Sequence, residues 1–147
     1  HRVYGIKEIL NLGIPASEFT ITQSGILALM GIRTNNDIDI IISSKIRNEL
    51  FNGNESFMKL ANNIEIFEKG KGKFMHYGAT SEEDLINDYS INIDGINFLE
   101  PRFYFNRKRK DRDKDKKDWE GINRFFEMNS HKGYPWNKMA DWKWGIS

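Results

Sequence analysis

Hydrophobic and polar residues alternate along this chain with two periods, one helical and one strand-like, and each change of period predicts the border of a short element. Apolar residues at helical spacing predict helices over residues 3–12, 26–30, 45–51 and 55–62. Alternating or uninterrupted β-branched segments predict strands over residues 19–22, 37–42, 64–67, 90–93 and 96–99. Strands and helices in this order predict an α/β (α+β) fold in which helices flank a mixed β-sheet.

Two local patterns predict a helix start and a hairpin between residues 81 and 99. Residues 81–84, Ser-Glu-Glu-Asp, resemble a capping box that opens a helix to about Asn87. The pair Asp94-Gly95 stands between two alternating segments, which is a strong signal for a hairpin with a two-residue loop.

The C-terminal third is dominated by charge. Pro101 suits the first turn of a helix, which we expect to continue through the charged residues 107–118 toward Phe126. The tryptophan-rich residues after this helix have no clear period. The chain is therefore interpreted as one domain, 1–128, followed by a tail, 129–147.

The amino-acid composition excludes several classes of protein. The 147 residues are 39% hydrophobic and 29% charged, which suffices for the core of one domain and excludes a disordered chain. The formal charge of +1 argues against a protein that coats nucleic acid by bulk charge. Cysteine is absent, which excludes disulfide scaffolds and thiolate zinc sites, and His1, His76 and His131 have no ligand spacing. Neither a membrane span nor a signal peptide is recognisable, so we expect a cytoplasmic protein without a membrane partner.

Asp37 and Asp39 are the most informative residues. Side chains two apart on a strand share a face, so both carboxylates project together from a hydrophobic strand. The two negative charges repel each other, and a bound divalent cation offsets this repulsion. Mg²⁺ prefers carboxylate oxygens together with substrate phosphates as its ligands. The alternative is that both aspartates merely stand at the exposed start of the strand.

The residues that precede this pair are compatible with an anion. Ser24-Gly25 is a small-residue turn that feeds a short helix, and Arg33 lies four residues before Asp37. Backbone N–H groups at such a turn and a guanidinium group both suit a phosphate.

These residues together resemble the nucleotidyltransferase superfamily of the DNA-polymerase-β type. The resemblance is strongest to the small bacterial branch that includes the AbiEii/MenT-type toxins and the antibiotic nucleotidyltransferases. It covers residues 19–118 and depends on four motifs: Ser24-Gly25, Gly31-Ile-Arg33-Thr34, Asp37-Ile-Asp39 and the basic pattern Arg112-Asp-Lys114-Asp115-Lys-Lys-Asp118. The chain departs from the family in the order Gln23-Ser24-Gly25 and in offering Glu65, rather than an aspartate, as third carboxylate.

The resemblance implies a nucleotidyltransferase fold and a metal-dependent enzyme. Asp37, Asp39 and Glu65 would be the catalytic residues and the ligands of Mg²⁺ (or Mn²⁺), with Glu65 also a candidate general base. The donor would be a nucleoside triphosphate such as ATP, bound by Ser24, Gly25, Arg33 and Lys114. The enzyme would transfer a nucleotidyl group from this donor to a hydroxyl or phosphate of an acceptor, which would be a small molecule, a tRNA end or a protein.

Three alternatives stay open at the level of sequence. One is a LicD/fukutin-like phosphosugar or phosphocholine transferase, and another is an inactive module of the same fold that binds nucleotide or regulates a partner. The third concerns the charged residues 107–118. In this interpretation they form a solvated helix face with i,i+4 ion pairs and do not bind phosphate. The loop 69–73, Lys-Gly-Lys-Gly-Lys, lacks the Walker spacing and is interpreted as a flexible turn.

Overall fold

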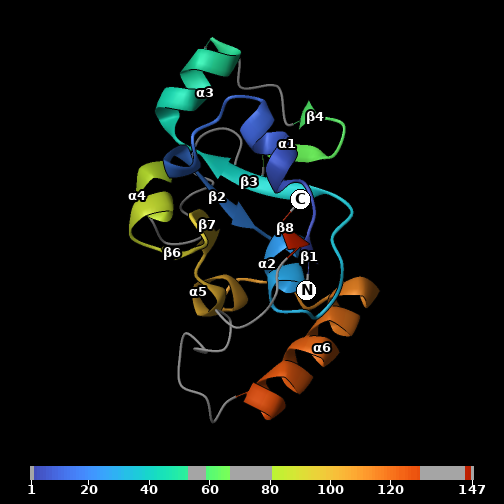
Figure 1. Ribbon diagram of the computed structural model, residues 1–147. Coiled ribbons are helices and arrows are strands. Elements are labelled where there is room, and N and C mark those ends of the chain that lie inside the picture. Colours follow the sequence, from blue (N-terminus) through green and yellow to red (C-terminus); the bar gives the residue numbers. More distant parts are fainter. Residues whose placement is uncertain (1, 53–58, 67–80, 130–144, 147) are drawn as a thin grey trace.

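A six-stranded mixed sheet organises the molecule (Figure 1), in a computed structural model that describes residues 2–52, 59–66, 81–129 and 145–146. The predicted α/β architecture, a mixed sheet with helices, is confirmed. Across the sheet the strands lie in the order β4 (Lys59–Ala61), β5 (Ile64–Ile66), β3 (Ile38–Ile42), β2 (Phe19–Thr22), β7 (Ile96–Leu99) and β6 (Ser90–Ile93).

The strand directions explain why the centre of the sheet is so apolar. Strand β2 pairs antiparallel with β3 and parallel with β7, and β3 pairs parallel with β5. A strand covered on both faces has no polar side to present to water. Accordingly Ile40, Ile41 and Ile42 on β3 are all fully buried, and the continuous burial of this strand is interrupted only at Asp39.

Six α-helices and a one-turn 3₁₀ helix, η1 (Ala16–Glu18), are described besides the strands. They are α1 (Ile6–Asn11), α2 (Ser24–Leu29), α3 (Ser44–Phe51), α4 (Glu82–Asn87), α5 (Pro101–Phe105) and α6 (Asp113–Asn129). In Figure 1, α3 and α6 lie at opposite ends of the molecule. None of the described helices combines the length and apolar character that crossing a bilayer needs.

Local capping signals are where the sequence predicts them. The Ser81 hydroxyl accepts the backbone N–H of Asp84 at 3.1 Å and starts α4. Pro101 occupies the first turn of α5. Strands β6 and β7 form the expected hairpin, whose loop residues Asp94 and Gly95 both have positive φ (53° and 86°).

The predicted helix over residues 55–62 is wrong for residues 59–62, the part of it that the structure describes. Residues 59–61 form the edge strand β4, which pairs antiparallel with β5. The turn at Asn62 and Asn63 brings the two strands together, so that backbone pairing across the turn outweighs a weak helical pattern. Residues 55–58 lie outside the described residues.

The continuous helix expected from Pro101 toward Phe126 is also wrong. Helix α5 ends at Phe105, and α6 begins only at Asp113. The charged block 107–118 therefore divides into a connecting loop and the first turns of α6. Its buried aspartates form ion pairs with basic residues of this loop.

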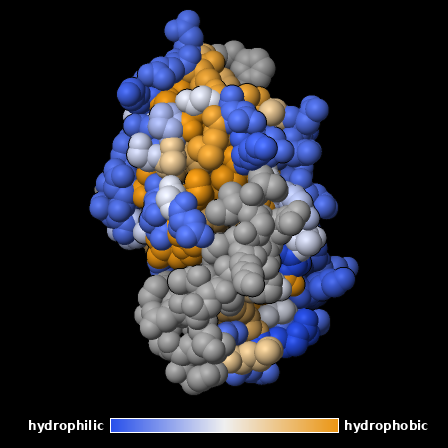
Figure 2. All heavy atoms as spheres, in the orientation of Figure 1, coloured by the Kyte–Doolittle hydropathy of each residue, from blue (hydrophilic) through white to orange (hydrophobic). Residues whose placement is uncertain are grey.

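The N-terminal strand was not predicted from the sequence. Strand β1 (Arg2–Val3) pairs in parallel with β8 (Gly145–Ile146), the described part of the tail beyond α6. The loop 69–73 and all three histidines lie outside the described residues. Figure 2 shows hydrophilic side chains around the border of the visible face, with apolar residues between them.

Candidate functional site

A cleft of about 1110 Å³ opens beside β2, β3 and β5 and is closed on its other side by the α5–α6 loop and α6. Six of the seven predicted site residues line it. They are Ser24, Arg33, Asp37, Asp39, Glu65 and Lys114. The cleft therefore brings together predicted residues that are up to 90 positions apart in the chain, from Ser24 to Lys114, and its two walls differ in charge.

The acidic wall is built by neighbouring parallel strands. On β3 and β5, Asp39 and Glu65 are direct partners in the register. Asp39 is half-buried, whereas Asp37 precedes the first residue of β3 and is exposed. All three carboxylates line the cleft. The expectation that Glu65 lies on a strand near the aspartates is confirmed.

The backbone of Asp37 is held from two sides. The Ser24 hydroxyl donates to its carbonyl oxygen at 3.2 Å, and the Asn35 amide donates to the same oxygen at 3.3 Å. Ser24 is the first residue of α2, so these bonds tie the start of that helix to the start of β3. The position of Asp37 is thus set by one bond from a neighbouring helix and one from its own loop, and not by strand pairing.

Asp39 is in an environment that disfavours its negative charge. Burial, the charges of Glu65 and Asp37, and a side-chain hydrogen bond with Glu65 raise the pKa of Asp39 to about 7. A proton shared with Glu65 relieves the repulsion, and a bound cation would relieve it in the same way.

The carboxylates as they stand do not form a three-ligand metal group. Among the described residues, no three histidine, cysteine, aspartate or glutamate side chains could together hold a metal ion. Mg²⁺ is commonly bound through one or two carboxylates, with substrate phosphates and water as the other ligands. The chemistry of the donor set, oxygen only, fits such a hard cation.

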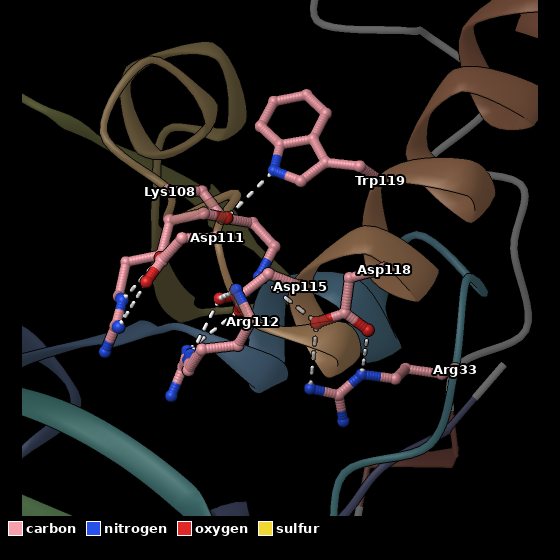
Figure 3. Close-up of polar contacts among 8 residues, drawn as sticks. Arg33, Lys108, Asp111, Arg112, Asp115, Asp118 and Trp119 are labelled. Atoms are coloured by element: carbon pink, nitrogen blue, oxygen red, sulfur yellow. Dashed lines mark hydrogen bonds and ion pairs between the residues drawn. The ribbon is translucent and has the colours of Figure 1, made fainter.

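Two buried aspartates organise the opposite, basic wall (Figure 3). Asp115 accepts two hydrogen bonds from the guanidinium of Arg112, at 2.7 and 2.8 Å, and one from the Arg112 backbone N–H at 3.2 Å. The Arg112 side chain holds the pKa of Asp115 at about 2. The Arg112 guanidinium is thus engaged with Asp115 within the protein at the start of α6.

Asp118 ties three segments of the chain together. It accepts a hydrogen bond from Arg33 Nε at 2.7 Å and another from Lys108 Nζ at 3.1 Å. The Lys108 side chain is only 6% exposed and also lies 3.7 Å from Asp115. Asp115 and Asp118 therefore orient basic side chains, and Arg33 lines the cleft as one member of this network.

The exposed cations of α6 point to the cleft from one face of the helix. Lys114, Lys117 and Arg124 line it, and their spacing of three and seven residues puts them on a single face. Within the described part of the chain these three side chains make no ion pair. Sequence reasoning found Lys114 and missed Lys117 and Arg124, which helical spacing from Lys114 would have found once the start of α6 was known.

Gly25, the seventh predicted site residue, does not line the cleft. It is buried in α2, and a Cβ atom there would lie 2.3 Å from Cγ2 of Ile21 on β2. The glycine is required by the packing of α2 on the sheet. The residue at the turn itself is Gln23, which lines the cleft with φ 56° and ψ −129°, a conformation that favours glycine.

Comparisons with known proteins found no family model, curated protein or solved structure that matches this chain. Its function is therefore inferred from the geometry and charge of the cleft.

Proposed function

We propose that the protein transfers a nucleotidyl group from a nucleoside triphosphate, such as ATP, to a hydroxyl group of an acceptor, with Mg²⁺ (or Mn²⁺) as cofactor. One observation carries the proposal. The paired carboxylates of Asp39 and Glu65 line one wall of the cleft, and its opposite wall presents cations that make no ion pair within the described protein. These cations are Lys114, Lys117 and Arg124. A ligand that satisfies both walls needs a metal ion at one end and negative charge along its length.

A metal-bound triphosphate meets these requirements. The carboxylates alone would repel a polyphosphate, so a divalent cation has to lie between the two. Lys114, Lys117 and Arg124 can each donate charge-assisted hydrogen bonds to phosphate oxygens. Arg33, held by Asp118 with 43% of its side chain exposed, adds a guanidinium group to the lining of the cleft.

The groups that line the cleft can account for each bond and proton of the transfer. The acceptor oxygen bonds to the α-phosphorus, the bond from that phosphorus to the pyrophosphate breaks, and the hydroxyl proton passes to the Glu65 carboxylate. Mg²⁺ held by the paired carboxylates of Asp37 and Asp39, with phosphate oxygens and water as its other ligands, would neutralise charge on the transferring and leaving phosphates. The buried ion pairs at the start of α6 keep the basic wall in place while the charges move.

The metal is tested by thermal unfolding of the wild type and of Asp39→Asn, with and without Mg²⁺ and a nonhydrolysable ATP analogue. A ligand that binds only the folded state raises the melting temperature. We expect the combination to stabilise the wild type and to have little effect on Asp39→Asn. Equal stabilisation of both proteins would contradict a metal site at Asp39.

The basic wall supplies a matched set of variants. Charge-assisted hydrogen bonds are worth about 1.5–3 kcal/mol, so Lys114→Ala and Lys117→Ala should each weaken triphosphate binding by about tenfold or more. Lys116→Ala is the control, because Lys116 is exposed and does not line the cleft. Equal, small losses of triphosphate affinity at all three positions would show that this helix face is merely solvated.

Catalysis is tested separately. Triphosphate binding without release of pyrophosphate in any cell extract would indicate the inactive binding module.

A further inference from the structure

A second cavity, of about 870 Å³, adjoins the cleft. It lies between the N-terminal corner of the chain, the loop before β3 and the turn that joins β4 to β5. Asn36 and Asp37 line both cavities, so the two spaces meet at these residues. Whatever binds in the second cavity is thus next to the proposed transfer centre.

The two cavities differ sharply in chemistry. The cleft is lined by eight basic and five acidic residues. The described lining of the second cavity contains no lysine, arginine or histidine, and its charged members are Glu8 and Asp37. The other polar groups are uncharged, namely the hydroxyls of Tyr4 and Thr34 and the amides of Asn35, Asn36, Asn62 and Asn63. We call this space the asparagine cavity.

The walls of the asparagine cavity are held in place without a ligand. Asn35 is 3% exposed and bonds both backbone groups of Tyr4, accepting from the N–H at 3.1 Å and donating to the carbonyl at 2.8 Å. The Asn63 carbonyl accepts the backbone N–H of Ile38 at 2.8 Å. Asn36, Asn62 and Asn63 are exposed residues that line the cavity. A preformed cavity of this size with a few polar groups suits a small molecule.

We propose that the asparagine cavity binds the acceptor, and that the acceptor is an uncharged or cationic small molecule that carries hydroxyl groups. The inference rests on the proposed function and names its second substrate. Amides and hydroxyls donate to and accept from such a molecule, and Glu8 favours a positive charge. A phosphate-rich acceptor, such as a nucleic-acid end, would meet carboxylates here and no basic side chain among the described lining residues.

Three sugars that differ chiefly in charge provide the probe. Glucosamine, glucose and glucose 6-phosphate are titrated at millimolar concentrations into the ¹⁵N-labelled full chain, and the side-chain amide signals of Asn62 and Asn63 are followed by NMR. We expect shifts with glucosamine and glucose and none with glucose 6-phosphate. Glucosamine should bind about threefold more tightly than glucose, which is what one exposed ion pair contributes.

Matched variants locate the charge preference. Glu8→Gln should remove the preference for glucosamine over glucose, whereas Glu127→Gln, an exposed position near the end of α6 that lines neither cavity, should keep it. In the same samples, a nonhydrolysable ATP analogue with Mg²⁺ should shift the signals of Lys114 and Arg124. That readout tests the nucleotide site independently of the acceptor.

The outcomes separate the two proposals. Binding of glucose 6-phosphate as tight as that of glucose overturns the inference, and so does the absence of shifts with all three sugars while the nucleotide still binds. Loss of nucleotide binding in the wild type would instead contradict the proposed function. Shifts confined to glucosamine and glucose, dependent on Glu8, support the inference.

Discussion

At the scale of single residues, Asp39 combines burial with two neighbouring carboxylates, and this makes the stability of the metal-free protein depend on pH. Its pKa is about 7 in the folded protein and near 4 in the unfolded chain. The folded state therefore binds the proton more tightly. The stabilising effect of that proton is complete below about pH 4 and is lost as the pH rises to about 7.

We expect the free energy of unfolding of the metal-free wild type to fall by about 2–4 kcal/mol between pH 4 and pH 8 through this group. Asp39→Asn should lack this decline and be the more stable protein at pH 8. Urea unfolding at a series of pH values measures both curves. Asp94→Asn, in the exposed hairpin loop, is the control and should keep the wild-type slope. A wild-type curve that rises over this range would contradict the assignment.

Gln23 carries backbone strain at the edge of the cleft. Its φ of 56° and ψ of −129° are natural for glycine and unfavourable for a residue with a Cβ atom. We expect Gln23→Gly to stabilise the fold by about 1 kcal/mol, because relief of strain outweighs the greater flexibility of glycine in the unfolded chain. Chemical denaturation measures the change. Gln23→Ala, which retains the strain, should give no such gain, and a gain from alanine equal to that from glycine would show that the side chain, not the backbone, is responsible.

At the scale of elements, the start of α6 depends on the buried carboxylate of Asp115. Removing its charge leaves Arg112 without a carboxylate partner and takes away one of the two carboxylates beside the nearly buried Lys108, which keeps Asp118. We expect Asp115→Asn to lower the free energy of unfolding at pH 7 by about 2–4 kcal/mol. Asp113→Asn, exposed on the same helical turn, should cost much less.

The pH dependence of this variant follows from the low pKa of Asp115. A carboxyl group with a folded-state pKa of about 2 stabilises the protein above about pH 4, and this stabilisation is lost as the pH falls toward 2. The wild type and Asp115→Asn should therefore converge in stability at acidic pH. A difference that stays constant from pH 7 to pH 2 would mean that shape rather than charge makes Asp115 important.

At the scale of the whole molecule, the core does not depend on the described part of the tail. Buried apolar residues of the described core extend from Val3 to Phe125, and β8 does not belong to the six-stranded sheet. The hydrogen bonds between Tyr4 and Asn35 hold the N-terminal segment without β8. We expect a chain shortened to residues 1–129 to unfold cooperatively, as followed by circular dichroism in urea.

A second truncation is the control for this boundary. A chain that ends at Asp118 lacks the buried residues Ile122 and Phe125, which α6 adds to the core. It should lose its cooperative transition. Loss of the transition in both shortened chains would place part of the essential core beyond residue 129.

The sequence by itself determined what depends on near neighbours in the chain. Strand β2, the cap of α4 and the β6–β7 hairpin agree with their patterns because alternation, a capping serine and an Asp-Gly loop act over a few residues. It also identified Asp39 as a polar position within an apolar strand, since a buried carboxylate there is costly without a partner.

Tertiary structure alone decided what depends on contacts between distant segments. Residues 59–61 became a strand through pairing with β5, and the break before α6 is held by ion pairs that no local pattern reveals. The bond from Arg33 to Asp118 joins residues 85 positions apart. The asparagine cavity likewise exists only because three separated segments line one space. The physical reason is the same throughout: propensity and pattern act along the chain, whereas partners for buried charge and the shapes of cavities are set by which segments the fold brings together.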